Sequence, residues 1–127
     1  MMDNVSILKM ASALARHAAD RHKILSENIA NADTSGYKAK DLEPFADAYS
    51  RFSKQGENKD NINAFPKFGD WRVETVNMSG ADSPNGNSVS IEDQMMRSIA
   101  AQQDHQAATL IYKKAIDIMR ISLGRGA

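Results

Sequence analysis

The sequence predicts a mainly α-helical protein. Two long helices, one toward each end of the chain, pair antiparallel and are joined by a long irregular segment with at most a short β segment. Apolar residues recur at spacings of three and four over the first 32 residues, which is the helical period. A capping pattern at Ser90 precedes a long run without proline or glycine. All three prolines fall between these two segments.

The first helix is expected from about residue 4 to residue 32. Its repeating positions form a heptad seam with one polar member, His22. They are Leu8, Ala11, Ala15, Ala18, His22, Leu25, Ile29 and Ala32. Alanine at several of these positions permits close approach of another helix but contributes little buried area at each one.

The second helix is expected to begin after Ser90. Ser90 and Asp93 fit a capping pattern, and Glu92 adds negative charge at the positive end of the helix dipole. Gly124 and Gly126 end the helix. Its late apolar residues form one stripe at helical spacing: Ala108, Ile111, Tyr112, Ala115, Ile116, Met119 and Leu123.

The segment between the helices, residues 42–87, is rich in proline, glycine and polar runs. DLEPFADAYSRF allows a short helical turn, and DWRVETVNM, residues 70–78, alternates well enough for one strand. The rest is expected to be irregular. We therefore divide the chain into residues 1–41, 42–87 and 88–127, which together make one structural domain.

Bulk composition excludes several classes of function. Lys plus Arg is 16 and Asp plus Glu is 16, so the net charge is zero and nucleic acid is not an expected partner. The N-terminal apolar residues are spaced rather than continuous, so neither membrane insertion nor a cleaved signal peptide is expected. Without cysteine the chain has no disulfides or thiolate metal sites.

No pattern indicates catalysis or a cofactor. His17 and His22 are five residues apart and diverge around a helix, which argues against a metal site. No Gly-x-Ser-x-Gly elbow is present, and the turn at Gly36 closes a helix where a phosphate loop would open one. We expect no enzyme activity, no catalytic residue, no metal and no cofactor.

The stretch NIANADTSGYKAKD, residues 28–41, follows the first helix. Asn28 and Asn31 lie on nearly the same side of that helix, where their amides can bond backbone groups freed at its end. Residues 33–35 favour a turn, and Gly36 can adopt a positive φ. From Tyr37 an extended segment is expected, with Lys38 and Lys40 on one side and Ala39 and Asp41 on the other. Local physics alone is also satisfied by a plain helix cap and turn.

LSENIANADTSGYKAKD, residues 25–41, resembles the N-terminal signature of bacterial flagellar axial proteins, the rod and hook family. Residues 87–120 are similar to the C-terminal region of the same family, with matches at Gly86, Asn87, Val89 and Glu92. Ser35 departs from the family pattern, which usually has proline there. The signature positions are Asn28, Asn31, Thr34, Gly36 and Tyr37.

The resemblance implies that the two helices pair as an antiparallel coiled coil in the inner tube of a helical assembly, the flagellar rod of the periplasm. It implies partners: other copies of the chain, neighbouring rod proteins, the adaptor between the MS ring and the rod, and the flagellar type III export apparatus. The implied assembly contacts are Leu8, Ala11, Leu25, Ile29, Ile111, Tyr112, Ile116, Met119 and Leu123. Export would need no cleaved signal.

The alternative is a cytoplasmic helical adaptor or secretion chaperone that binds one client through its helix seam. Narrow alanine-rich seams leave helix flanks that a globular protein would cover with more chain. We expect this cover to come from other molecules, or the helices to be loosely ordered until they find it. On the rod hypothesis, ordering of the terminal helices is coupled to assembly.

Overall fold

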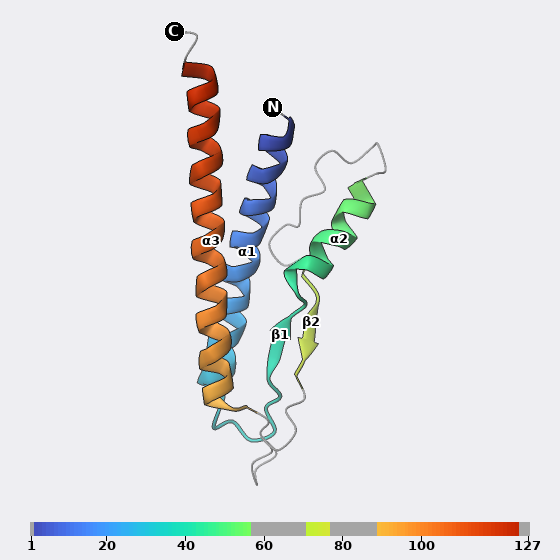
Figure 1. The fold of residues 1–127 in the computed structure, drawn as a ribbon. Coiled ribbons are helices and arrows are strands. Elements are labelled where there is room, and N and C mark those ends of the chain that lie inside the picture. Colours follow the sequence, from blue (N-terminus) through green and yellow to red (C-terminus); the bar gives the residue numbers. More distant parts are fainter. Residues whose placement is uncertain (1, 57–70, 77–88, 125–127) are drawn as a thin grey trace.

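The computed structural model describes residues 2–56, 71–76 and 89–124. In chain order the elements are α1 (Met2–Ala30), β1 (Lys40–Leu42), α2 (Phe45–Gly56), β2 (Val73–Thr75) and α3 (Ile91–Gly124). Figure 1 shows α1 and α3 side by side and antiparallel, with the two strands and α2 along α1. The predicted fold class is thereby confirmed. The irregular residues predicted at 57–70 and 77–88 lie outside the described ranges.

α1 and α3 meet along columns of buried residues, mostly alanine, that are spaced seven apart. Ala11, Ala18 and Leu25 are buried in α1. In α3 the buried residues are Gln94, Ala101, Ala108 and Ala115. Because alanine has a single methyl group, the helix backbones can approach closely, and each contact buries little apolar area.

Within the single chain, α3 covers only part of the predicted seam. His22 was placed in it as a polar member, but its side chain is exposed, and Ile29 is 36% exposed. α3 presents one column of small residues, so only one of the two predicted columns of α1 is covered. The other buried face of α1 carries Ala13, His17 and Asp20 and turns toward the strands and α2.

β1 and β2 form an antiparallel pair with Asp41 opposite Glu74. As predicted, the side chains of 38–41 alternate: Ala39 and Asp41 are buried, and Lys38 and Lys40 are exposed. Strand β2 lies within the segment 70–78 that the alternation had indicated. The pair places Asp41, and Glu43 just after the strand, beside α1.

α2 is longer than the single turn predicted from DLEPFADAYSRF. The helix runs for 12 residues because Phe45, Ala48 and Phe52 recur at helical spacing and have a core to pack against. That core consists of Leu42, Ala48 and Trp71, with Ile24, Phe45 and Phe52 partly buried around it. Phe45, Phe52 and Trp71 therefore meet in one place. This is a tertiary contact that local sequence could not reveal.

The start of α3 is capped as predicted. The Ser90 hydroxyl accepts a hydrogen bond from the Asp93 backbone N–H at 3.4 Å. Ser90 thus satisfies one of the donors freed at the helix N-terminus. Among the described residues, neither long helix contains an apolar stretch of the length and purity that crossing a bilayer requires.

Candidate functional site

The turn after α1 is fixed by Asn31, Thr34 and Gly36. The Asn31 amide donates to the Glu27 carbonyl at 2.8 Å, and the Thr34 hydroxyl donates to Asn31 Oδ1 at 3.1 Å. Gly36 has φ +75°, the left-handed conformation that the sequence had predicted there. The chain therefore leaves α1 in a defined direction and returns beside it as β1.

Asn28 is the central residue of the site and is fully buried. Its amide group donates to the Lys40 carbonyl at 2.6 Å and to Gln94 Oε1 at 2.8 Å. Its carbonyl oxygen accepts from the Lys40 N–H at 3.1 Å and from the Tyr37 hydroxyl at 3.2 Å. Both donors and both acceptor positions are used, so one side chain holds α1, the start of β1 and α3 together.

Tyr37 extends this contact along the turn. Its hydroxyl donates to Asn28, and the ring is half-buried against the end of α1. Burial, and then the negative charge of Glu27, raise the pKa of Tyr37 above 10.0. The phenol therefore keeps its proton and remains a donor at neutral pH.

Asp41 forms a second connection between the same three elements. It accepts two hydrogen bonds from Arg21 of α1, at 3.0 and 3.2 Å, and one from Arg97 of α3 at 2.7 Å. Arg97 also pairs with Asp93 at 2.6 Å. Burial alone would raise the pKa of Asp41, but the hydrogen bonds from both guanidinium groups outweigh it and lower that pKa below 3.8.

Glu43 forms a third connection, on the side of α2. Its carboxylate accepts from the Arg51 guanidinium at 2.8 Å and from the Arg72 backbone N–H at 2.9 Å. Its backbone carbonyl accepts from His17 Nε2 at 2.7 Å. Burial opposes ionisation, yet the Arg51 and Arg72 contacts prevail and lower the pKa of Glu43. We call Asn28, Asp41 and Glu43 with their hydrogen-bond partners the polar junction.

The five signature residues lie together at this junction. Asn28 and Tyr37 bond each other, and Asn31, Thr34 and Gly36 shape the adjoining turn. Their arrangement holds the turn in one conformation. The bonds bring together backbone and side-chain groups of the chain itself.

The nine predicted assembly contacts are placed in three environments. Ala11 and Leu25 are buried between α1 and α3 within the chain, whereas Leu8, Ile116 and Met119 are half-buried. Four are exposed: Ile29, Ile111, Tyr112 and Leu123. Four of the nine therefore present apolar surface outward.

Sequence reasoning missed the partners of the signature. The roles of Asp41, Gln94 and Arg97 depend on contacts between residues that are 56 and 66 positions apart in the chain. Gln94 did carry a signal. It stands seven residues before Ala101 in the column that continues to Ala108 and Ala115, so a polar residue was visible at a seam position.

The histidines do not converge. His17 is buried and donates to the Glu43 carbonyl, whereas His22 and His105 are exposed. No group of three or more His, Cys, Asp or Glu side chains suited to a metal ion occurs within residues 2–56, 71–76 and 89–124. The carboxylates of the junction are engaged by arginines and backbone N–H groups.

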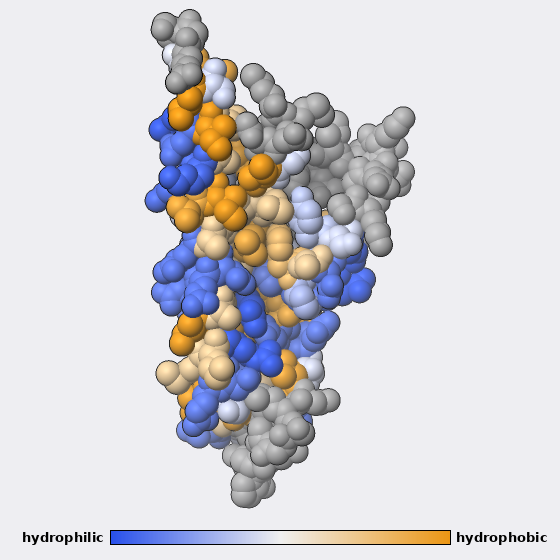
Figure 2. All heavy atoms as spheres, viewed as in Figure 1, coloured by the Kyte–Doolittle hydropathy of each residue, from blue (hydrophilic) through white to orange (hydrophobic). Residues whose placement is uncertain are grey.

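α3 also exposes an unusual amount of apolar surface. Seven of its large apolar side chains are more than half exposed: Met95, Met96, Ile99, Leu110, Ile118, Ile121 and Leu123. We call these residues the exposed apolar surface of α3, and Figure 2 shows apolar surface gathered toward the C-terminal end of that helix. Large contiguous patches of exposed apolar side chains are typical of sites that contact other proteins or membranes.

Residues 10–38 match a family model described as flagella basal body rod protein. The match runs from the middle of α1 through the five signature residues. It supports a member of the flagellar basal-body rod family, which is structural rather than enzymatic. No curated protein matches the chain.

Proposed function

We propose that this protein is a structural subunit of the bacterial flagellar rod, and specifically a FlgB-like subunit of its proximal part. In that role it forms part of the drive shaft across the periplasm and is required for motility. The observation that carries the proposal is the pairing of the rod-family segment, residues 10–38, with a buried Asn28 that ties both long helices together. A segment used only to cap a helix would not need Gln94 from the far end of the chain.

The proposed mechanism divides the molecule between rigidity and assembly. The polar junction fixes α1, β1 and α3 as one unit that can transmit torque. The exposed apolar surface of α3 would be buried against neighbouring subunits. Heterologous packing of each subunit on the next produces an open helical tube rather than a closed ring, which suits a shaft.

The helix pair is proposed to wind as a coiled coil in the assembled rod. Ile29, Ile111, Tyr112 and Leu123 would meet neighbours directly because they are exposed in the single chain. Ala11 and Leu25 would act indirectly by holding α1 against α3. Leu8, Ile116 and Met119, at the margin of the pair, would be covered on assembly. Burial of this surface offsets the entropy of ordering the helix ends.

The proposed partners are other copies of the chain, neighbouring rod proteins and the adaptor between the MS ring and the rod. Delivery would use the flagellar type III export apparatus without a cleaved signal. No nucleic acid, cofactor or inserted membrane segment takes part in this proposal.

The direct test is mass spectrometry of detergent-extracted flagellar basal bodies, after acid or shear removes the filament. Several copies of this chain in each basal body are expected. Recovery only from the cytoplasm of flagellated cells would contradict the rod proposal and favour the adaptor or secretion-chaperone alternative. Deletion of the coding sequence should abolish swimming, and the unmodified sequence supplied in trans should restore it.

A further inference from the structure

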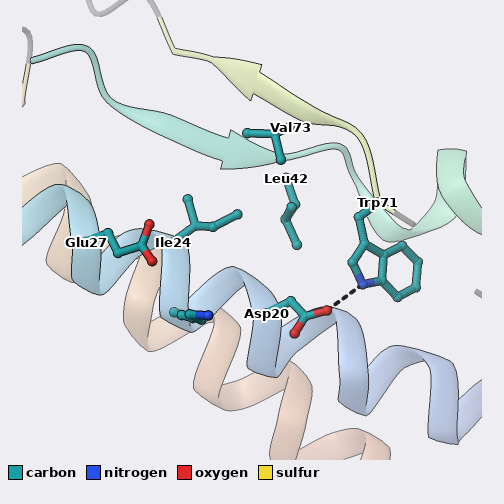
Figure 3. Close-up of a pocket in the computed structure, with 7 residues that line it drawn as sticks. Asp20, Ile24, Glu27, Leu42, Trp71 and Val73 are labelled. Atoms are coloured by element: carbon teal, nitrogen blue, oxygen red, sulfur yellow. Dashed lines mark hydrogen bonds between the residues drawn. The ribbon is translucent and has the colours of Figure 1, made fainter. Parts of the chain in front are cut away.

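A small pocket lies between α1 and the strands, and Asn28, Asp41 and Glu43 do not line it. Its volume is about 160 Å³, and it is lined by Asp20, Lys23, Ile24, Glu27, Leu42, Trp71 and Val73. Figure 3 shows Asp20, Ile24 and Glu27 on α1 facing Leu42, Val73 and Trp71 from the strand side. Small-molecule pockets usually have roughly 300–1,000 Å³, so this one is suited to a single side chain.

The chemistry of the pocket combines an apolar wall with excess negative charge. Ile24, Leu42 and Trp71 supply the wall, and an indole is the aromatic group that attracts cations best. The ionisable lining residues are two carboxylates, Asp20 and Glu27, and one ammonium, Lys23. A side chain with an apolar stem and a cationic end complements both features.

Asp20 supplies an independent indication of a missing donor. Its side chain is only 7% exposed, and its Oδ2 accepts from Trp71 Nε1–H at 2.8 Å. No described residue, Lys23 included, donates a hydrogen bond to its Oδ1. A buried carboxylate oxygen without a donor is costly. Because the χ2 torsion of aspartate is soft, a small rotation can present Oδ1 to the pocket.

We propose that this pocket binds an arginine or lysine side chain of an adjacent protein. The stem would contact Ile24, Leu42 and Trp71, and the cationic end would donate to Asp20 Oδ1 beside Glu27. Val73 at the pocket is 54% exposed, so apolar residues flanking the basic one would be covered as well. The identity of the adjacent protein as a rod neighbour rests on the proposed function, but the chemistry of the pocket does not.

Titration of the full-length chain with N-acetylarginine amide tests the proposal, and N-acetylcitrulline amide is the matched neutral control. Trp71 is the sole tryptophan, so its fluorescence reports the pocket directly. The arginine probe should change the emission saturably and raise Tm, because a ligand of the folded chain stabilises it. The citrulline probe should do neither. Equal responses to the two probes, or no response to either, would overturn the proposal.

Two variants sharpen the test. Asp20→Asn keeps an acceptor for Trp71 but replaces the available oxygen with a donating amide, so affinity for the arginine probe should fall about tenfold. Val73→Lys changes an exposed side chain and should also weaken binding through like-charge repulsion. Unchanged affinity in both variants would refute the assignment of the pocket. Because the titration needs no flagellum, its result is separate from that of the basal-body experiment.

Discussion

The polar junction and the exposed apolar surface of α3 differ in what they bury: the junction buries polar groups, whereas α3 leaves large apolar side chains exposed. At the junction, Asn28, Asp41 and Glu43 are buried polar groups whose hydrogen bonds are supplied by the chain itself. Along α3, large apolar residues such as Leu110 and Ile121 remain 57% and 60% exposed. Contacts within the chain thus set the orientation of the helices, whereas much of the large apolar surface of α3 stays exposed in the single chain. Substitutions can test the polar junction and the exposed apolar surface of α3 separately.

Asn28→Ala should have the largest effect on the free energy of unfolding. Four hydrogen bonds are lost, and the buried Gln94 and Lys40 groups lose their partner. We expect a loss of about 3 kcal/mol. Urea unfolding followed by far-UV circular dichroism measures it. Asn31→Ala, at a half-buried turn position, is the matched control with an expected loss of about 1 kcal/mol. Similar losses for both would contradict the central role of Asn28.

Asp41→Asn should rank second. The change leaves Arg21 and Arg97 without their shared carboxylate. Breaking a fully buried ion pair costs more, but these arginine side chains are 20% and 30% exposed, so about 2 kcal/mol is expected. The same urea experiment applies. An Asp93→Asn variant removes only the half-buried Asp93 partner of Arg97. Its loss in free energy of unfolding should be less than half that of Asp41→Asn.

The pH dependence of stability should follow from Asp41 and Glu43. Both carboxyl groups have a lower pKa in the folded chain than when unfolded. Their stabilisation is therefore fully present above the unfolded values and is lost as pH falls through the folded ones. Urea midpoints should decline below about pH 4. The urea midpoint of Asp41→Asn should decline less steeply with falling pH than that of the unmodified chain. An identical profile would show that Asp41 does not contribute to the pH dependence of stability.

Ala108→Leu tests the close contact of α1 and α3. Ala108 is fully buried, so three extra carbon atoms must push the helices apart, at a cost of about 2 kcal/mol. Its neighbour Ala107 is exposed. Ala107→Leu should change stability by less than about 0.5 kcal/mol. Thermal unfolding of the two variants, side by side, decides whether the alanine column fixes the helix spacing.

The smallest effect on the single chain is expected from Ile121→Ser combined with Leu123→Ser. Both residues are exposed, so unfolding should change by less than about 0.5 kcal/mol. On the proposed function, incorporation into basal bodies and swimming should nevertheless fall sharply. Arg120→Ser, on the same helical turn, is the control and should retain both. Normal swimming of the double variant would show that this end of α3 is not an assembly contact.

Local sequence signals predicted the elements well because their causes are local. The positive φ of Gly36, the Ser90 cap and the alternation at 38–41 each depend on neighbouring residues. The length of α2 was underestimated because its apolar face is stabilised by Trp71, which is 19 residues beyond Phe52. The pairing of Asn28 with Gln94 could not be predicted, since the chain gives no local signal for a contact 66 residues apart.

The sequence alone therefore determined the two helices, the turn between α1 and β1, and the signature that indicates a flagellar rod protein. The heptad spacing and the turn residues act over a few neighbouring positions, so they can be recognised in the sequence. The tertiary structure decided which column of α1 meets α3, and brought Asp41, Gln94 and Arg97 together at one junction. It did so because hydrogen bonds and ion pairs between distant residues depend on how the helices are packed, and neighbouring residues in the chain do not specify these partners.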